Sequence, residues 1–115
     1  MRNPPVLPQS PEALLDQLCT IFPEYRAAYR GPIHDGAPSV HSVLISFSMF
    51  LGSAAHSASE WQLRSFGKLV SVAVEAGGEL ENAFGTCLLE HLHQIGAWKP
   101  LRPYLSKLAR EDTKA

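Results

Sequence analysis

The feature that most constrains the fold is an apolar stripe with helical spacing between residues 79 and 95. Its members recur every three or four positions: Leu80, Ala83, Phe84, Cys87, Leu88, Leu92 and Ile95. This spacing places them along one side of an α-helix, and such a side is normally buried against other elements. Gly96 follows as a helix stop, because glycine suits the left-handed conformation that often ends a helix. We therefore expect an amphipathic helix over residues 79–95.

Segments before this stripe show the same periodicity. Ser10-Pro11-Glu12 predicts a helix start, because serine caps, proline suits the first turn and glutamate favours the positive end of the helix dipole. A short second helix is expected over 23–30. A third, apolar on nearly all sides, is expected over about 39–54, with Ser39 as its cap. A strand at 43–51 is the competing prediction, because this segment is rich in Val, Ile and Phe, but the pattern does not alternate as a strand would.

The remaining segments also predict helices. Ser57 and Glu60 match the spacing of a capping box, and the helix that they open is expected to stop at Gly77-Gly78. A last short amphipathic helix is expected after Lys99-Pro100. Its apolar members are Leu101, Tyr104, Leu105 and Leu108.

The domain organisation follows from these segments. Residues 1–9 contain three of the nine prolines and no periodicity, so we expect an extended N-terminal arm. A single helical domain is expected over 10–110, followed by a polar tail over 111–115. The predicted fold is all-α, a compact bundle of five to six short helices.

The composition argues against several classes of protein. The chain of 115 residues is 45% hydrophobic and 18% charged, unlike a disordered tail or a fibrous protein. Its net charge of −1 argues against nucleic-acid binding, which normally needs a basic excess. No apolar run approaches the ~20 residues that cross a bilayer. The start of the chain, residues 1–5, lacks the apolar region of a signal peptide. We expect a cytoplasmic protein that binds neither nucleic acid nor membrane.

Two residue pairs suggest metal sites. Cys87 and His91 are four residues apart, a spacing that zinc ligands on a helix can use, but no further ligand pair accompanies them. Glu90 and His93 form a Glu-x-x-His pair, but a di-iron bundle needs a second such pair. We therefore interpret Cys87 as a core residue and expect no metal or other cofactor.

Catalytic motifs are also missing from the sequence. It contains no GxSxG elbow and no glycine-rich phosphate loop, and Cys87 lies in an apolar stripe without a basic neighbour. The enzymatic alternative is an acid–base pair assembled by folding from His34, Asp35 or Glu90. Our prediction is that the protein is not an enzyme.

The distribution of charge indicates a binding surface. Every charged residue from 75 to 98 is acidic: Glu75, Glu79, Glu81 and Glu90. Every charged residue from 99 to 110 is basic: Lys99, Arg102, Lys107 and Arg110. Glutamates at a helix start and basic residues at a helix end complement the helix dipole, which is one explanation. The other explanation is an acidic patch around residues 75–81 that binds a basic partner.

One long motif resembles a known family. The helix Leu80-Glu81-Asn82-Ala83-Phe84-Gly85-Thr86-Cys87-Leu88-Leu89-Glu90-His91-Leu92, preceded upstream by Phe22-Pro23-Glu24, resembles the signature of small all-helical bacterial proteins of unassigned biochemistry. Similar proteins often look like immunity proteins of polymorphic or contact-dependent toxin systems. The resemblance implies a helical fold over about residues 12–108 and no catalytic residues.

The resulting expectation is a protein-binding module, namely an immunity protein that neutralises a secreted bacterial toxin by stoichiometric binding. The alternatives are a small helical adaptor, a homodimerising structural domain with a self-complementary apolar patch, and a metal-binding protein or enzyme. The exposed candidates for the partner surface are the loop 31–38 and the acidic turn 75–81. Glu90 and His93 in the motif are further interface candidates. The candidate residues are His34, Asp35, Glu75, Glu79, Glu81, Glu90 and His93.

Overall fold

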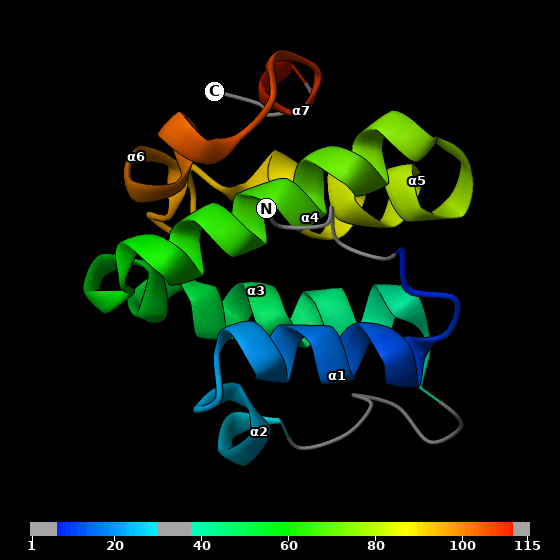
Figure 1. Cartoon of the computed structure of the whole chain (residues 1–115), viewed down its shortest axis with the longest axis horizontal. Coiled ribbons are helices and arrows are strands. Elements are labelled where there is room, and N and C mark those ends of the chain that lie inside the picture. Colours follow the sequence, from blue (N-terminus) through cyan, green and yellow to red (C-terminus); the bar gives the residue numbers. More distant parts are fainter. Residues whose placement is uncertain (1–6, 30–37, 112–115) are drawn as a thin grey trace.

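The fold is described by a computed structural model for residues 7–29 and 38–111, and all its regular elements are helical (Figure 1). The elements are α1 (Pro11–Ile21), α2 (Tyr25–Ala28), α3 (Val40–Ser57), α4 (Glu60–Ala76), α5 (Gly78–Cys87), α6 (Trp98–Leu101) and α7 (Lys107–Glu111), with 3-10 turns η1 (Leu89–His91) and η2 (Arg102–Tyr104). The all-α prediction is confirmed. The seven α-helices in these residues exceed the expected five to six, because the last predicted helix is divided into α6 and α7.

The helices pack in two groups. Helices α1 to α3 lie together in the lower half of Figure 1, and α4 to α7 lie above them. Helix α3 packs against α1 and α5, while α4 packs against α1, α5 and α7. The contacts of α3 with α5 and of α1 with α4 therefore join the two groups.

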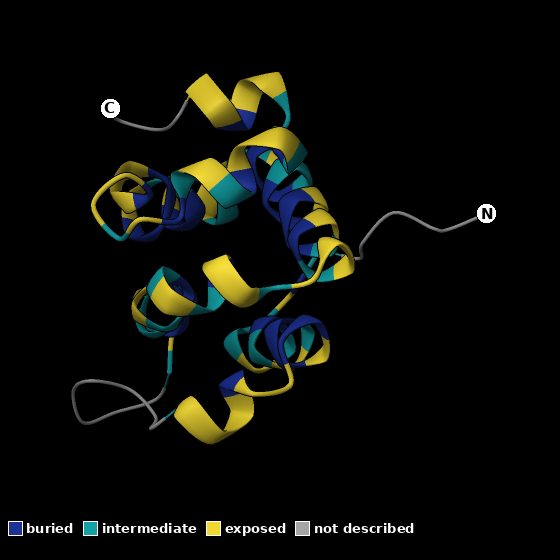
Figure 2. Cartoon of the chain, turned by 90° about the vertical axis from the view of Figure 1, so that its left-hand side faces the viewer, coloured by how far each residue is buried: buried dark blue, intermediate teal, exposed yellow. Residues whose placement is uncertain are grey.

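A single cluster of buried apolar side chains lies between the helices. Seven apolar residues that recur at helical spacing in the sequence are all at most 1% exposed: Val43, Leu44, Phe47, Leu69, Phe84, Leu88 and Leu92. Figure 2 shows that the buried faces of the helices point inward and the exposed faces outward. The helical periodicity of the sequence thus identifies the buried face correctly.

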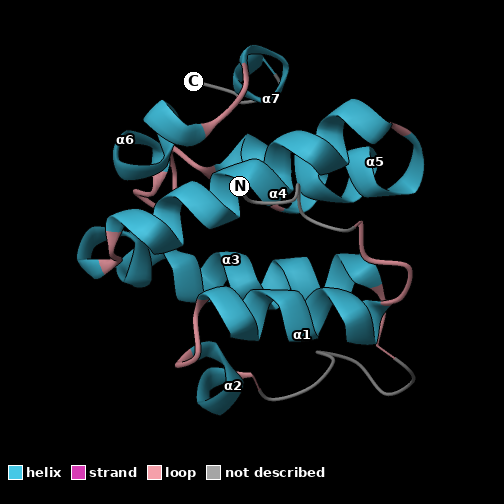
Figure 3. Ribbon diagram, in the orientation of Figure 1, coloured by secondary structure: helices cyan, strands magenta, loops and turns pink. Residues whose placement is uncertain are grey.

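The strand considered for residues 43–51 is wrong, because these residues lie within α3. Neither Figure 3 nor the assigned elements contain a strand in the described part of the chain. Val43, Leu44, Phe47 and Leu51 are fully buried and recur at helical spacing. Burial on one side of the helix decides the structure despite the β-branched residues.

The predicted helix over 79–95 is divided. Helix α5 ends at Cys87, and Leu88 leaves the helical region with φ −130° and ψ −64°. The chain then forms η1 and further turns up to Gly96, which has φ 78°. The chain bends at Leu88, and the side chains of Leu88 and Leu89 are both fully buried in the core.

The predicted capping box at Ser57 and Glu60 is also wrong. Ser57 is the last residue of α3, and the box lies two residues later. Ser59 Oγ accepts a hydrogen bond from the Gln62 amide at 3.1 Å, and the Ser59 amide donates to Gln62 Oε1 at 2.9 Å. The predicted caps Ser10 and Ser39 are confirmed.

The ends of the chain differ from the prediction in one described residue. Glu111 belongs to α7, whereas the sequence analysis placed it in the polar tail. The expected single helix after Lys99-Pro100 is split into α6, η2 and α7. Residues 1–6 and 112–115 lie outside the described residues.

Candidate functional site

The turn between α4 and α5 positions the acidic residues. Gly77 and Gly78 have φ values of 74° and 71°, a backbone conformation that glycine adopts far more readily than other residues. These two residues turn the chain so that α5 packs back against α4. Glu75 and Glu79 are exposed on either side of the turn, and Glu81 is half-buried. We call these three glutamates the acidic turn.

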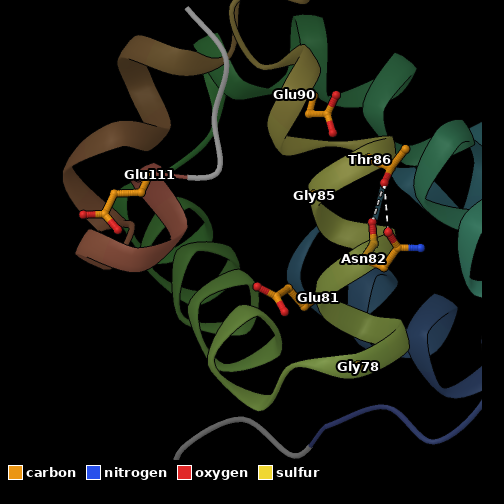
Figure 4. A pocket seen from close by; sticks show the side chains of 7 residues that line it. All are labelled: Gly78, Glu81, Asn82, Gly85, Thr86, Glu90 and Glu111. Atoms are coloured by element: carbon orange, nitrogen blue, oxygen red, sulfur yellow. Dashed lines mark hydrogen bonds between the residues drawn. The ribbon is translucent and has the colours of Figure 1, made fainter.

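Next to the acidic turn lies a hollow of about 320 Å³, which we call the acidic hollow. Its lining residues are Gly78, Glu81, Asn82, Gly85, Thr86, Glu90 and Glu111. Figure 4 shows Glu81 and Glu90 on the α5 side, with Glu111 across from them on α7. The fold thus places residues of α5, η1 and α7 around one concave surface, and the Glu111 carboxylate points away from those of Glu81 and Glu90 (Figure 4).

Hydrogen bonds hold the polar side chains of this hollow in place. Thr86 Oγ1 donates to the Asn82 carbonyl at 2.7 Å and lies 3.4 Å from Asn82 Oδ1 (Figure 4). Asn82 Nδ2 lies 3.5 Å from Nε2 of His41, which belongs to α3. The hollow is therefore built on helices that are fixed to the core and to one another.

The carboxylates of the hollow give it a negative potential. Three glutamates and no basic residue of the described chain line the hollow. A concave surface with charges of one sign attracts ligands of the opposite sign. The arrangement suits electrostatic attraction of a basic group.

The structure brings some of the predicted site residues together and separates others. Glu81 and Glu90 share the hollow, whereas Glu75 and Glu79 lie on the acidic turn outside it. His93 lies after η1 with its ring 4.8 Å from that of Trp98, and it does not line the hollow. The loop candidates His34 and Asp35 lie outside the described residues.

Sequence reasoning missed part of the acidic hollow. Asn82, Thr86 and Glu111 line it but were not among the candidate residues. Asn82 and Thr86 are one turn apart on α5, and both are exposed, so their shared helix face was a usable signal. Glu111 had no such signal, because only the packing of α7 against α4 brings it close to Glu81.

Cys87 and His91 do not have the helical geometry that their spacing suggested for a pair of zinc ligands. Helix α5 ends at Cys87, so His91 does not lie one turn further along the same helix. Cys87 is buried, and burial raises the pKa of its thiol, which keeps it protonated and weakly nucleophilic. His91 is exposed, and its Nδ1 lies 2.8 Å from Gln94 Oε1. Within residues 7–29 and 38–111, no three His, Cys, Asp or Glu residues are grouped as metal ligands would be.

The exposed large apolar side chains come from three helices. Ile45 and Met49 lie one turn apart on α3, Trp61 lies on α4, and Leu108 lies on α7. Met49 is the most exposed of them, at 73%. No helix in the described segments has the length and apolar character needed to span a membrane.

Comparison with known proteins gives no relative: no family model, no curated protein and no solved structure matches the chain.

Proposed function

We propose that this protein is a binding module that neutralises a basic partner protein, in the manner of an immunity protein that inhibits a secreted bacterial toxin. The acidic turn and the acidic hollow form the proposed binding surface. The protein acts stoichiometrically by covering the active site of the partner or by holding the partner in an inactive conformation. No bond is made or broken in this mechanism.

The observation that carries the proposal is the assembly of the acidic hollow from separate elements. Glu81, Glu90 and Glu111 surround a hollow of about 320 Å³ on a helical scaffold. Acidic groups at an interface speed the approach of a basic partner and help to set the orientation in which it binds. The scaffold is preformed, so little entropy is lost by ordering it during binding.

A homodimer has weaker support from the described surface. A dimer interface needs a self-complementary apolar patch, and the exposed apolar side chains are spread over α3, α4 and α7. The chemistry of Cys87 likewise does not favour an enzyme, because its buried thiol has a raised pKa.

Charge reversal at the acidic turn tests the proposal. The double variant Glu79→Lys/Glu81→Lys should bind the candidate toxin encoded by the adjacent reading frame more slowly and more weakly. The loss should be larger at low salt than at high salt, because screening shortens the range of charge interactions to about 10 Å at 0.1 M salt. Binding kinetics at two salt concentrations, together with growth protection in cells that express the toxin, measure this effect.

A second double variant, Glu12→Lys/Glu60→Lys, is the matched control. Like Glu79 and Glu81, these glutamates lie in the first turn of a helix, so the change in charge and the lost dipole interaction are equivalent, and Glu60 additionally loses its exposed ion pair with Arg64, which is worth at most about 1 kcal/mol. Each lost dipole interaction costs ~0.3–1 kcal/mol, so both double variants should remain folded. Equal loss of binding in both variants, or none in the first, would contradict the proposed surface.

A further inference from the structure

A second hollow of about 250 Å³ lies where the ends of α1 and α3 meet the start of α4. These helix ends are found together in the left part of Figure 1. Phe50 contributes aromatic surface to this hollow, Phe22 lies beneath it almost fully buried, and Glu24 and Gln62 contribute polar groups. We call it the aromatic hollow. Phe22 and Glu24 belong to the Phe-Pro-Glu tripeptide, whose glutamate the core does not explain.

Small side chains leave this hollow open. The rings of Phe22 and Phe50 have centroids 5.9 Å apart at an interplanar angle of 79°. Phe22 is 1% exposed and Phe50 is half-buried, so both rings are held firmly by the core. Ala54 and Ala58 lie beside them, and neither is large enough to fill the space. The result is an open cup with an aromatic surface that the described chain does not occupy.

One carboxylate stands at the edge of this cup. Gln62 Nε2 donates to the Ile21 carbonyl at 3.0 Å and lies 3.4 Å from Glu24 Oε1. Gln62 Oε1 accepts from the Ser59 amide, so the carboxamide is held in a fixed orientation. Glu24 is the only charged residue among those that line the aromatic hollow. Its exposed carboxylate can accept several hydrogen bonds and retains acceptor capacity for a ligand.

Size and charge select the kind of group that fits. The volume of about 250 Å³ is below the ~300–1,000 Å³ of most small-molecule sites, and suits a single side chain. A phenylalanine side chain would cover the Glu24 carboxylate without giving it a hydrogen-bond donor, which costs free energy, and tyrosine or tryptophan offers a single uncharged donor. A planar guanidinium can stack on a phenyl ring and also donate two hydrogen bonds to a carboxylate. Lysine lacks this planar geometry.

We propose that the aromatic hollow binds an arginine side chain of the partner protein. This proposal rests on the protein-binding function proposed above and adds a specific anchor to it. The half-buried ring of Phe50 provides the stacking surface, Phe22 supports that ring from the core, and Glu24 pairs with the guanidinium. Arginine is enriched among the residues that dominate the energy of protein interfaces, most often where it enters a pocket.

A short peptide tests the hollow without the partner. The isolated protein, labelled with ¹⁵N, is titrated with acetyl-Gly-Arg-Gly-amide and followed by NMR. A second peptide contains citrulline in place of arginine and keeps the shape of the side chain without its charge. The arginine peptide should cause saturable shifts of the amides that line the hollow, at millimolar concentrations, and the citrulline peptide should bind several-fold more weakly.

Two variants with the same change in charge distinguish the specific effect of the Glu24 carboxylate from the effect of net charge. Glu24→Gln should reduce binding of the arginine peptide to the level of the citrulline peptide. Glu12→Gln, at the opposite end of α1, should leave binding unchanged. Absence of localised shifts, equal binding of both peptides, or equal effects of the two variants would overturn the proposal. Tighter binding of acetyl-Gly-Phe-Gly-amide would also overturn it and would indicate an aromatic occupant.

The outcome of the peptide titration does not depend on the proposed function. The titration uses no toxin, so a negative result removes the arginine site even if charge reversal at Glu79 and Glu81 abolishes protection. Conversely, specific binding of the arginine peptide would persist if the acidic turn proved unimportant. The two results therefore distinguish the anchor from the wider binding function.

Discussion

At the scale of the residue, Gly67 marks the tightest approach between elements. A Cβ atom added to Gly67 on α4 would lie 2.5 Å from the Tyr104 carbonyl oxygen and 2.7 Å from Tyr104 Cβ. Gly67→Ala should therefore lower the free energy of unfolding by about 1–3 kcal/mol, because the backbone near Tyr104 must shift. Alanine in an ordinary helix interior would instead stabilise by ~1 kcal/mol. Urea unfolding measures the difference.

Gly52→Ala is the comparison for this substitution. Gly52 also lies within a long helix, but its added Cβ would meet the Ile95 carbonyl oxygen at 3.0 Å, which needs a smaller adjustment. The loss at Gly52 should be smaller than the loss at Gly67. An unchanged or raised stability of Gly67→Ala would show that α4 and the η2 segment are further apart than described.

Tyr25 has a buried hydroxyl group, and ionisation of this hydroxyl destabilises the folded protein. Its Oη lies 2.9 Å from Ser46 Oγ and donates toward the Val43 carbonyl at 3.3 Å, and burial raises its pKa to about 12. An unfolded tyrosine ionises near pH 10, so the unfolded chain loses this proton first as pH rises. The contribution of neutral Tyr25 to the free energy of unfolding is complete below pH ~10. As pH rises to ~12, this contribution declines by up to about 2–3 kcal/mol.

Unfolding curves between pH 9 and 12 for the wild-type protein and Tyr25→Phe check this prediction. The variant should lose about 1 kcal/mol at neutral pH through its missing hydrogen bond. Its free energy of unfolding should also decline less steeply above pH ~10 than that of the wild-type protein, because other titrating groups contribute equally to both proteins. Parallel pH profiles would mean that Tyr25 ionises as freely in the folded protein as in the unfolded chain.

At the scale of the element, Gln62 both caps α4 and connects it to α1. Its side chain completes the capping box with Ser59 and donates to the Ile21 carbonyl at 3.0 Å. Gln62→Ala should cost about 1–2 kcal/mol, because a cap and a connection between helices are lost together. Ser42→Ala is the matched control, since Ser42 completes the capping box of α3 and no hydrogen bond from its side chain reaches another described helix.

Thermal or urea unfolding of the two variants separates capping from the connection. Gln62→Ala should lower the free energy of unfolding more than Ser42→Ala, because Gln62 contributes the additional hydrogen bond to Ile21. Equal losses would indicate that the connection to α1 adds no stability to the protein.

At the scale of the whole molecule, one core predicts one unfolding transition. The buried apolar side chains from α1 through α7 form a single cluster, and α4 contacts helices from both groups. Unfolding should therefore be cooperative, because no group of helices has a separate core. Far-UV circular dichroism should give the same midpoint as the fluorescence of single-tryptophan variants that retain either Trp61 on α4 or Trp98 on α6. Separate midpoints would show that the two groups unfold independently.

The sequence alone determined the class of fold and most of the core. The spacing of Val43, Leu44 and Phe47 indicates a buried helix face, because a helix must place residues three and four apart on the same side. Serines before the first turn similarly mark helix starts at Ser10 and Ser39. These inferences succeed because they depend on neighbours within one or two turns of the chain.

Only the tertiary structure decided where elements break and which distant residues meet. The helix expected over 79–95 ends at Cys87, and Glu111 lines the same hollow as Glu81 because α7 packs on α4. The aromatic hollow likewise combines Phe22 with Phe50 across two helices. Such contacts join positions far apart in the chain, and their geometry depends on how whole helix faces pack together. Local periodicity specifies which side of each helix is buried, but it does not specify which helix covers that side.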